Sequence, residues 1–371
     1  TKVNLQMDVD SNLDDKNDRY LNSEFSSSSV TLMPGKTISG SGALTTADTS
    51  AEKVEKAKVA IAQSNVSTLR SAVKLTNNGT INFTGTGMAG IVGEYSEINN
   101  NSIINVTGTN STGIISANGS LATNNGTINI GNGGTGLAGI NYLGVTATPA
   151  SSIPTYGNQS IDLVHNGSIV STGNSAAIGV LASDLKSVVD KNGTTLNITN
   201  ANAARITLGS NSTIDVSSAA GGVGVYSKGL LRSGVMANVT DSGSQIKINA
   251  NGIGLYLEGT ELSATAGSIQ AINNTTAKGI YTDSNVNSAK NITLLGDKSI
   301  AIHNFGKNSQ YTTDININNS GNIKLGDSSN RNDPSIGIYT KYANVNHHGT
   351  IETGSKSLGI FSESPLHLTL P

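Results

Sequence analysis

The strongest constraint on this chain is a unit that repeats about ten times between Asn77 and Phe361. Each unit has an Asn/Gly turn, a short strand-like segment that carries Ile, a second Gly turn, and then Gly-Ile-Tyr or a close relative. The first segment centres on Ile81, Ile104 and Ile128, at intervals of 23 and then 24 residues. A period of this length, built from strand-like units without helical ones, is typical of a β-solenoid.

The alternation within each segment predicts which side chains are buried, because residues two apart on a strand share a face. Ile253, Leu255 and Leu257 would point one way, with Gly254 and Tyr256 on the other side. Stacked coils bury a continuous aliphatic column that no single coil could hide. We therefore expect an all-β fold, a right-handed parallel β-helix of about ten to eleven coils with two strand types per coil.

Aromatic residues recur at one position of the second segment, just after the Gly and the aliphatic residue. They predict a ladder of rings on the outer surface, formed by Tyr226, Tyr256, Tyr281, Tyr339 and Phe361. Stacked rings stabilise a fold by roughly 0.5–1.5 kcal/mol per pair beyond their area burial, which is the structural interpretation. The functional alternative is a flat aromatic strip that contacts a partner or a sugar.

Composition agrees with a rod rather than a compact enzyme. The chain has 371 residues, 43 of them Gly, with no Cys and no Trp. A solenoid core is a narrow column that needs little bulk, and its turns use Gly and Asn at positive φ. A net charge of −2 removes the electrostatic case for a nucleic-acid partner, which requires a clustered basic face.

The first 75 residues do not show the repeat. Residues 1–29 are polar and predict a loosely ordered segment. Residues 30–75 are expected to form an N-terminal cap with a short helix over 49–63, because Thr49-x-x-Glu52 matches a capping box. The β-helix would then occupy 76–364, followed by a tail over 365–371.

Insertions that stretch individual coils are the expected recognition surface, because loops on a rigid scaffold carry binding residues. They lie at 141–166, 183–207 and 303–335. The first insertion supplies the partner-binding candidates Tyr142, Pro149, Ile153, Pro154 and Tyr156. The alternative is that the loops are merely tolerated, because loop length costs little free energy. The 183–207 segment could instead hide an irregular coil around Leu196 and Ile198.

Catalytic motifs are isolated within the repeat. Two segments, 85–90 and 134–139, match G-x-G-x-x-G. A dinucleotide site requires a helix after this motif, whereas strand-like residues follow both segments. Asp241-Ser242-Gly243-Ser244 and His348-Gly349-Thr350 resemble protease motifs but lack their partners. The adjacent His347 and His348 would point to opposite faces of a strand. We therefore expect no enzyme activity, catalytic residue, cofactor or metal; the enzymatic alternative is a polysaccharide-cleaving β-helix.

The recurrent Asn-Asn-Gly-Thr-Ile-Asn and Gly-Ile-Gly-Leu-Tyr units, with the Cys-free polar N-terminal segment, resemble passenger regions of fusobacterial autotransporter (type V secretion) adhesins. The resemblance covers roughly residues 77–361. It implies a virulence-associated passenger on the bacterial cell surface, attached to the outer membrane through a C-terminal barrel absent from these residues. Its partners would be host-cell receptor proteins or glycans, or other bacteria.

No heptad stalk accompanies the repeat, so we expect a monomer, with a homotrimer as the alternative. The same resemblance allows an alternative function, in which the chain is a non-binding structural stalk that displays a tip domain.

Overall fold

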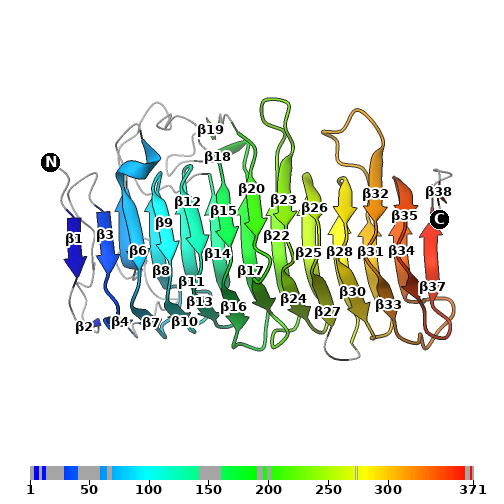
Figure 1. The fold of residues 1–371 in the computed structure, drawn as a ribbon, viewed down its shortest axis with the longest axis horizontal. Coiled ribbons are helices and arrows are strands. Elements are labelled where there is room, and N and C mark those ends of the chain that lie inside the picture. The colour runs from blue at the N-terminus through cyan, green and yellow to red at the C-terminus, as the bar shows by residue number, and fades with distance from the viewer. Residues whose placement is uncertain are drawn as a thin grey trace.

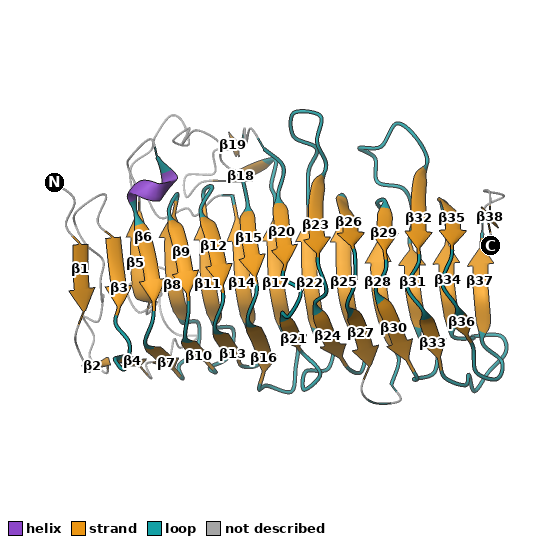
Figure 2. Cartoon of the chain, viewed as in Figure 1, coloured by secondary structure: helices purple, strands orange, loops and turns teal. Residues whose placement is uncertain are grey.

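The computed structural model describes residues 4–7, 11–13, 29–40, 59–64, 69–141, 160–189, 195–198, 202–271, 273, 275–363 and 368–369. These residues wind along one axis, with successive coils following one another from the N-terminal end to the C-terminal end (Figure 1). Nearly all regular structure is strand, joined by short turns (Figure 2). The expected all-β parallel β-helix is confirmed.

Three long parallel sheets make up the rod. We name them sheets A, B and C. Sheet A contains β1 (Asn4–Met7), β3 (Ser29–Leu32), β6 (Lys74–Asn77), β9 (Glu97–Asn100), β12 (Leu121–Asn124), β15 (Asp162–His165), β20 (Arg205–Leu208), β23 (Ala237–Asp241), β26 (Thr260–Ala264), β29 (Val286–Ser288), β32 (Ile315–Asn319), β35 (Ala343–His347) and β38 (Leu368–Thr369).

Sheet B contains β2 (Ser11–Leu13), β4 (Thr37–Gly40), β7 (Thr80–Phe83), β10 (Ile103–Val106), β13 (Thr127–Ile130), β16 (Ser168–Ser171), β21 (Thr213–Asp215), β24 (Gln245–Ile248), β27 (Ser268–Ala271), β30 (Asn291–Leu294), β33 (Ile323–Leu325) and β36 (Ile351–Glu352). Sheet C contains β5 (Val59–Ser64), β8 (Ala89–Glu94), β11 (Thr112–Ala117), β14 (Thr135–Ile140), β17 (Ile178–Ser183), β22 (Val223–Lys228), β25 (Gly252–Glu258), β28 (Ala277–Thr282), β31 (Ile300–Asn304), β34 (Ile336–Thr340) and β37 (Leu358–Ser362).

Each coil passes through one strand of sheet A, one of sheet B and one of sheet C. Sheet C has 11 strands, which fixes the described part of the rod at 11 complete coils. The expectation of two strands per coil is wrong, because the strands of sheet A form a third repeated element. A strand such as β12 carries one buried aliphatic residue, Ala122, and ends in the buried Asn124, so its hydrophobic pattern is weak.

The N-terminal region belongs to the β-helix. Strands β3, β4 and β5 pair in parallel with β6, β7 and β8, and Val30, Ile38 and Ile61 extend the buried columns. The separate cap over 30–75 is therefore wrong for its described residues. The helix expected over 49–63 is wrong for 59–63, because these residues belong to strand β5 (Val59–Ser64). The rest of 49–63 lies outside the described residues.

Residues 1–29 also contribute to the rod. Strand β1 pairs with β3, and β2 pairs with β4, so the expected loose order does not hold for these two segments. At the other end β38 pairs with β35, which makes residues 368–369 of the expected tail part of sheet A.

The core consists of aliphatic columns that run along the axis. From β4 to β33, each strand of sheet B places one Ile in register with the Ile of the next coil. Its members are Ile38, Ile81, Ile104, Ile128, Ile169, Ile214, Ile246, Ile269, Ile292 and Ile323, none more than 1% exposed. This arrangement explains why the Ile spacing was the clearest signal in the sequence.

Sheet C departs from simple alternation at the recurrent glycine position of its strands. In β25, Gly254 and Leu255 are both buried, while Ile253 and Tyr256 are partly exposed. The expectation that Ile253 faces inward is therefore wrong. A Cβ on Gly254 would lie 2.6 Å from the carbonyl oxygen of Gly279 in the next coil and 2.6 Å from Ile269 Cγ2. Any larger residue at this position would therefore collide with the next coil.

A polar column runs inside the rod at the ends of the sheet A strands. Asn77 Nδ2 donates to Asn100 Oδ1 at 2.8 Å, and Asn100 Nδ2 donates to Asn124 Oδ1 at 2.7 Å. Asn124 Nδ2 lies 3.1 Å from His165 Nδ1, while His165 Nε2 lies 3.0 Å from the Thr213 carbonyl oxygen. These buried side chains satisfy one another, as buried polar groups must.

The insertions leave the rod at its edges. Within 183–207, β18 (Ser187–Val189) and β19 (Thr195–Asn197) form an antiparallel hairpin, so the irregular coil around Leu196 is wrong. Within 303–335, the chain forms two loops, 305–314 and 326–335, separated by β32 and β33. The single short helix among the described residues is the 3-10 turn η1 (Arg70–Ala72), and no described helix is long and apolar enough to cross a membrane.

Candidate ligand-binding trough

The expected partner-binding residues of the first insertion, Tyr142, Pro149, Ile153, Pro154 and Tyr156, lie outside the described residues. The described chain leaves sheet C at Asn141 and resumes at Ser160, just before β15. Ser160 lies in the wall of a surface depression, so the insertion joins the rod beside a hollow on the molecular surface.

The five aromatic residues of the expected ladder lie in one row on the outer face of sheet C. Two further rings, His303 and Phe305, belong to the same cluster and were missed, because His303 replaces Tyr in its coil and Phe305 follows the strand. Centroid distances along the row are 4.8 Å for Tyr226–Tyr256, 5.0 Å for Tyr256–Tyr281, 4.9 Å for Tyr281–His303, 4.7 Å for His303–Tyr339 and 5.7 Å for Tyr339–Phe361.

The Tyr281 ring in this row has neighbouring groups against its faces. Phe305 lies 4.3 Å from Tyr281, and the Lys278 ammonium lies 4.2 Å from the centroid of the Tyr281 ring. Burial, and then the nearby Lys278 charge, lowers the pKa of His303 to about 4, so this ring is neutral at physiological pH. A sugar would need an open ring face, and Tyr281 offers little of one.

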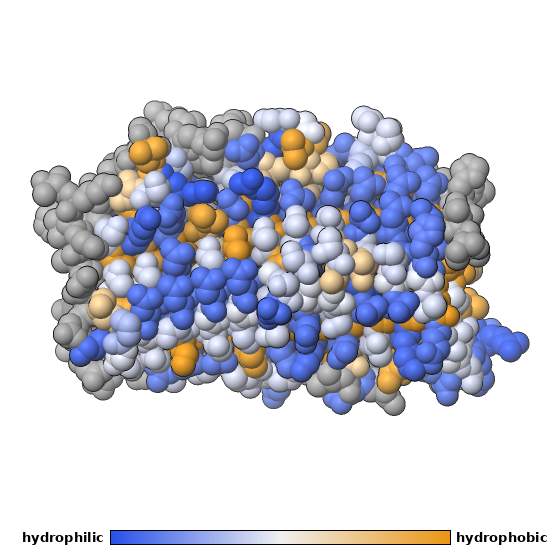
Figure 3. All heavy atoms as spheres, in the orientation of Figure 1, coloured by the Kyte–Doolittle hydropathy of each residue, from blue (hydrophilic) through white to orange (hydrophobic). Residues whose placement is uncertain are grey.

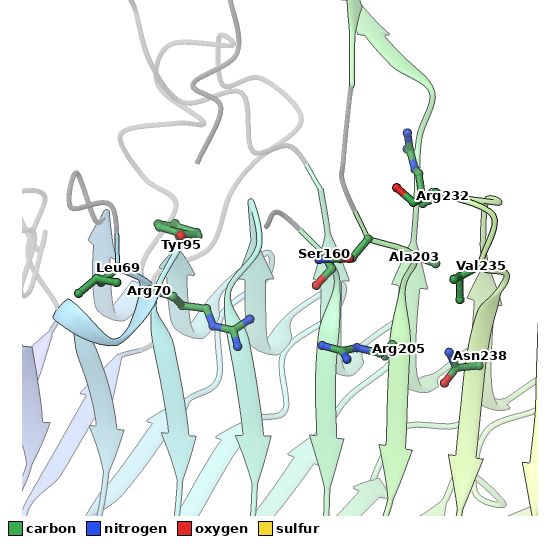
Figure 4. Close-up of a pocket in the computed structure, with 11 residues that line it drawn as sticks. Leu69, Arg70, Tyr95, Ser160, Ala203, Arg205, Arg232, Val235 and Asn238 are labelled. Atoms are coloured by element: carbon green, nitrogen blue, oxygen red, sulfur yellow. The ribbon is translucent and has the colours of Figure 1, made fainter. Parts of the chain in front are cut away.

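A trough on the outer side of sheet A is the larger candidate surface. We define its upstream basin, of about 750 Å³, by Leu69, Arg70, Tyr95, Ser160, Asn202, Ala203, Arg205, Arg232, Ser233, Val235 and Asn238. Figure 4 shows that Arg70 and Arg205 point toward each other along this face, from η1 and β20. Val235 and Asn238 lie on the opposite side of Arg205 from Arg70.

Asp162 of β15 lies between the two arginines. Its Oδ2 atom is 3.0 Å from Arg205 Nη2 and 3.5 Å from Arg70 Nη1. Arg70 Nη1 also donates to the Gly119 carbonyl oxygen at 3.3 Å. One carboxylate thus meets two guanidinium groups.

Arg232 has a different role in the basin wall. Its Nη2 atom donates to Asp184 Oδ1 at 2.7 Å and to the Leu185 carbonyl oxygen, while Nη1 donates to the Ile198 carbonyl oxygen. Burial raises the pKa of Asp184, and the adjacent Arg232 opposes that shift. Arg232 therefore holds the 183–207 insertion against the 229–236 loop.

A downstream basin of about 520 Å³ continues the trough along the rod and shares Val235 and Asn238 with the upstream basin. Its other lining residues are Met236, Thr240, Glu261, Leu262, Ser263, Asn285, Val286, Asn287, Asn316 and Asn318. In Figure 3 hydrophilic side chains cover the face of the rod over β29, β32 and β35. The downstream basin is therefore lined mainly by neutral amides and hydroxyls.

The 229–236 and 305–314 loops lie beside this basin, and both project at the same edge of the rod in Figure 1. Gln310 of the 305–314 loop accepts a hydrogen bond from the Leu231 backbone N–H and contacts the Gly229 carbonyl oxygen at 3.4 Å. Tyr311 Oη donates to Glu261 Oε1 at 3.0 Å. These bonds tie residues 81 positions apart, Gly229 and Gln310, into one wall. This contact could not be predicted from the sequence, because neither loop carries a repeat.

The catalytic motifs of the sequence have structural roles here. The 85–90 and 134–139 glycine motifs run into strands β8 and β14, without the helix that a dinucleotide site needs. Asp241 and Ser244 bond to each other and to Lys290 inside the rod. His347 Nδ1 lies 3.1 Å from Asn319 Nδ2. Among the described residues, no three His, Asp or Glu side chains gather as a potential metal site.

Comparisons with protein-family models, with curated proteins and with solved structures found no match to this chain.

Proposed function

We propose that this chain is the exposed passenger of a bacterial surface adhesin, and that it binds a ligand of host cells or other bacteria along the trough of sheet A. The trough itself carries the proposal, because two adjoining basins share Val235 and Asn238 and extend over neighbouring coils. Main-chain pairing holds these coils rigidly, so side chains on the surface are pre-organised, which reduces the entropy cost of binding.

The lining of the trough suits binding better than hydrolysis. Glycoside hydrolysis uses a pair of carboxyl groups on either side of the scissile bond. The two described carboxylates at the basins are both engaged: Asp162 is paired with Arg70 and Arg205, and Glu261 Oε1 accepts hydrogen bonds from Tyr311 and Asn285. This distribution favours a recognition surface over a polysaccharide-cleaving enzyme.

The first insertion belongs to the proposed recognition surface, because Ser160 at its end lines the upstream basin. The expected aromatic and proline contacts of that insertion remain candidates for the partner. The aromatic ladder on sheet C is assigned to stability instead, since its rings contact one another at centroid distances of 4.7–5.7 Å.

Binding of the purified chain to epithelial cells and to partner bacteria tests the proposal. A variant with residues 142–159 replaced by a short Gly-Ser turn should lose binding and keep its β-rich circular dichroism spectrum. The matched control is Lys324→Ala, on the sheet B side of the rod, which should bind as the parent does. If neither the parent nor the control binds, the chain acts as a stalk and the adhesive proposal is wrong.

A further inference from the structure

We infer that the basin-facing donors of Arg205, beside the Asp162 carboxylate that Arg205 shares with Arg70, form a subsite for the single carboxylate of an acidic glycan, with the neutral sugars lying along the downstream basin. This inference rests on the proposed function and names its ligand class. It begins from the two guanidinium groups, which approach the same Asp162 oxygen at 3.5 Å and 3.0 Å from opposite sides.

Arg205 supplies the donors. Its side chain is 53% exposed, and in the described part of the chain its guanidinium bonds only to Asp162, through Nη2. A guanidinium presents five N–H donors in a planar fork that matches a carboxylate. Asp162 thus acts as a positioning residue: it binds Arg205 Nη2, and the other N–H donors of the Arg205 guanidinium face the basin.

The upstream basin also carries two exposed apolar side chains. Val235 is 57% exposed and Leu69 is 65% exposed, at the two ends of the upstream basin. Such side chains fit the C–H face of a pyranose ring or the methyl group of an N-acyl substituent. A basin that combines cationic donors with exposed aliphatic groups matches an acidic sugar better than a bare inorganic anion.

The downstream basin argues for a glycan rather than an acidic peptide. Thr240, Ser263, Asn287 and Asn318 are in register on consecutive strands of sheet A, so each coil offers one neutral hydrogen-bonding side chain. Adjacent strands lie about 4.8 Å apart, which gives a regular array of donors and acceptors for sugar hydroxyl groups. No cation lines this basin among the described residues.

Charge placement also limits the ligand to one acidic group. Asp162 lies on one side of Arg205, and Glu261 lies two strands away on the other side, in the same row across β20, β23 and β26. A second ligand carboxylate would meet Glu261 and be repelled, since like charges at an interface cost affinity. Polyanions such as heparin are therefore disfavoured, whereas a glycan with one acidic residue is accommodated.

Titration calorimetry with the whole chain tests the subsite. The probes are the methyl glycoside of N-acetylneuraminic acid, its neutral methyl ester, methyl glucuronide and methyl galactoside. We expect the two carboxylates to bind at least about tenfold more tightly than the two neutral probes, because a charged hydrogen-bond pair is lost in the neutral compounds. Equal binding of the acid and its ester would overturn the inference.

Variants locate the site. Arg205→Ala should remove the preference for the carboxylate, and Arg205→Lys should restore only part of it, because Lys lacks the planar fork. Asp162 keeps Arg70 as a partner in both variants, so the fold should persist. Arg331→Ala removes an exposed arginine of the 326–335 loop and is the matched control, with unchanged binding expected. Unchanged binding by Arg205→Ala would overturn the assignment.

The cell assay separates this inference from the proposed function. If Arg205→Ala still binds cells as the parent does, and removal of acidic sugars from the cells has no effect, the adhesin proposal stands and the carboxylate subsite is wrong. Tighter binding of heparin or of an acidic peptide than of the acidic sugars would overturn the ligand class.

Discussion

Lys290 and Asp241 form an ion pair inside the rod, across two coils, with Nζ 2.6 Å from Oδ2 and neither side chain exposed. Lys290 Nζ also contacts the Ser244 carbonyl oxygen at 2.8 Å and Ser244 Oγ at 3.0 Å. Gly267 lies next to the Lys290 side chain, since a Cβ on Gly267 would be 2.6 Å from Lys290 Nζ. The pair therefore depends on a small residue in the coil between its members.

Lys290→Met should destabilise the fold by about 3–5 kcal/mol, because it leaves the Asp241 carboxylate buried without a cation. Chemical denaturation followed by circular dichroism measures the loss. Adding Asp241→Asn should recover part of it by removing the unpaired charge. The control is Lys324→Met, whose exposed pair with Glu352 should contribute less than about 1 kcal/mol. Equal losses in the two Lys variants would contradict the assigned role.

Acid should weaken the fold through His165. Burial lowers the pKa of this imidazole from 6.5 to about 4. Between these values the unfolded chain binds more protons than the folded one, so stability is lost as pH falls through that window. The shift corresponds to about 3 kcal/mol at 1.36 kcal/mol per pKa unit.

The matched variant is His165→Asn, which continues the column formed by Asn77, Asn100 and Asn124. Thermal unfolding at pH 7 and pH 4.5 should show a smaller acid effect for this variant than for the parent. His348→Asn, on the exposed neighbour of His347, should leave the parent's acid effect intact. An identical pH dependence in parent and His165→Asn would show that protonation of His165 does not cause the acid destabilisation.

Sequence patterns identified the parts of this fold that repeat with apolar residues. The Ile column of sheet B and the ring row of sheet C recur at regular intervals, so their strands could be placed from the amino-acid sequence alone. Sheet A was missed because its strands present residues such as Thr123 and Asn124, which show little hydrophobic alternation. The N-terminal coil was missed because the long segment between β4 and β5 hides its period.

The trough could not be predicted for a different reason. Arg70, Asp162 and Arg205 are far apart in the chain and come together only because the solenoid stacks η1, β15 and β20 along one face. No local motif marks them, since Asp162 and Arg205 occupy a strand position where other coils carry Glu97, Leu121 or Asn238. Contacts of this kind follow from register, which requires the number of strands per coil to be known.

Gly254→Ala should destabilise the rod by about 1–3 kcal/mol, the usual cost of overpacking. The new Cβ would meet the Gly279 carbonyl oxygen at 2.6 Å, and a backbone atom cannot move aside without shifting the next coil. Gly359 occupies the same position of the last complete coil and has no atom within 4 Å of its added Cβ. Gly359→Ala is therefore the control, with an unchanged midpoint of thermal unfolding. A similar loss in both variants would rule out the contact with the Gly279 carbonyl oxygen as the cause.

Tyr256→Ala should lower the unfolding temperature and leave binding to cells unchanged, because the ladder is assigned to stability. The ring has Tyr226 at 4.8 Å, Tyr281 at 5.0 Å and Phe305 at 6.3 Å, so truncation removes three ring pairs, each worth about 0.5–1.5 kcal/mol. Tyr256→Phe keeps these pairs and should unfold close to the parent. Tyr342→Ala removes a ring that is 50% exposed and serves as the surface control. Loss of cell binding by a folded Tyr256→Ala variant would move the recognition surface from sheet A to the aromatic row of sheet C.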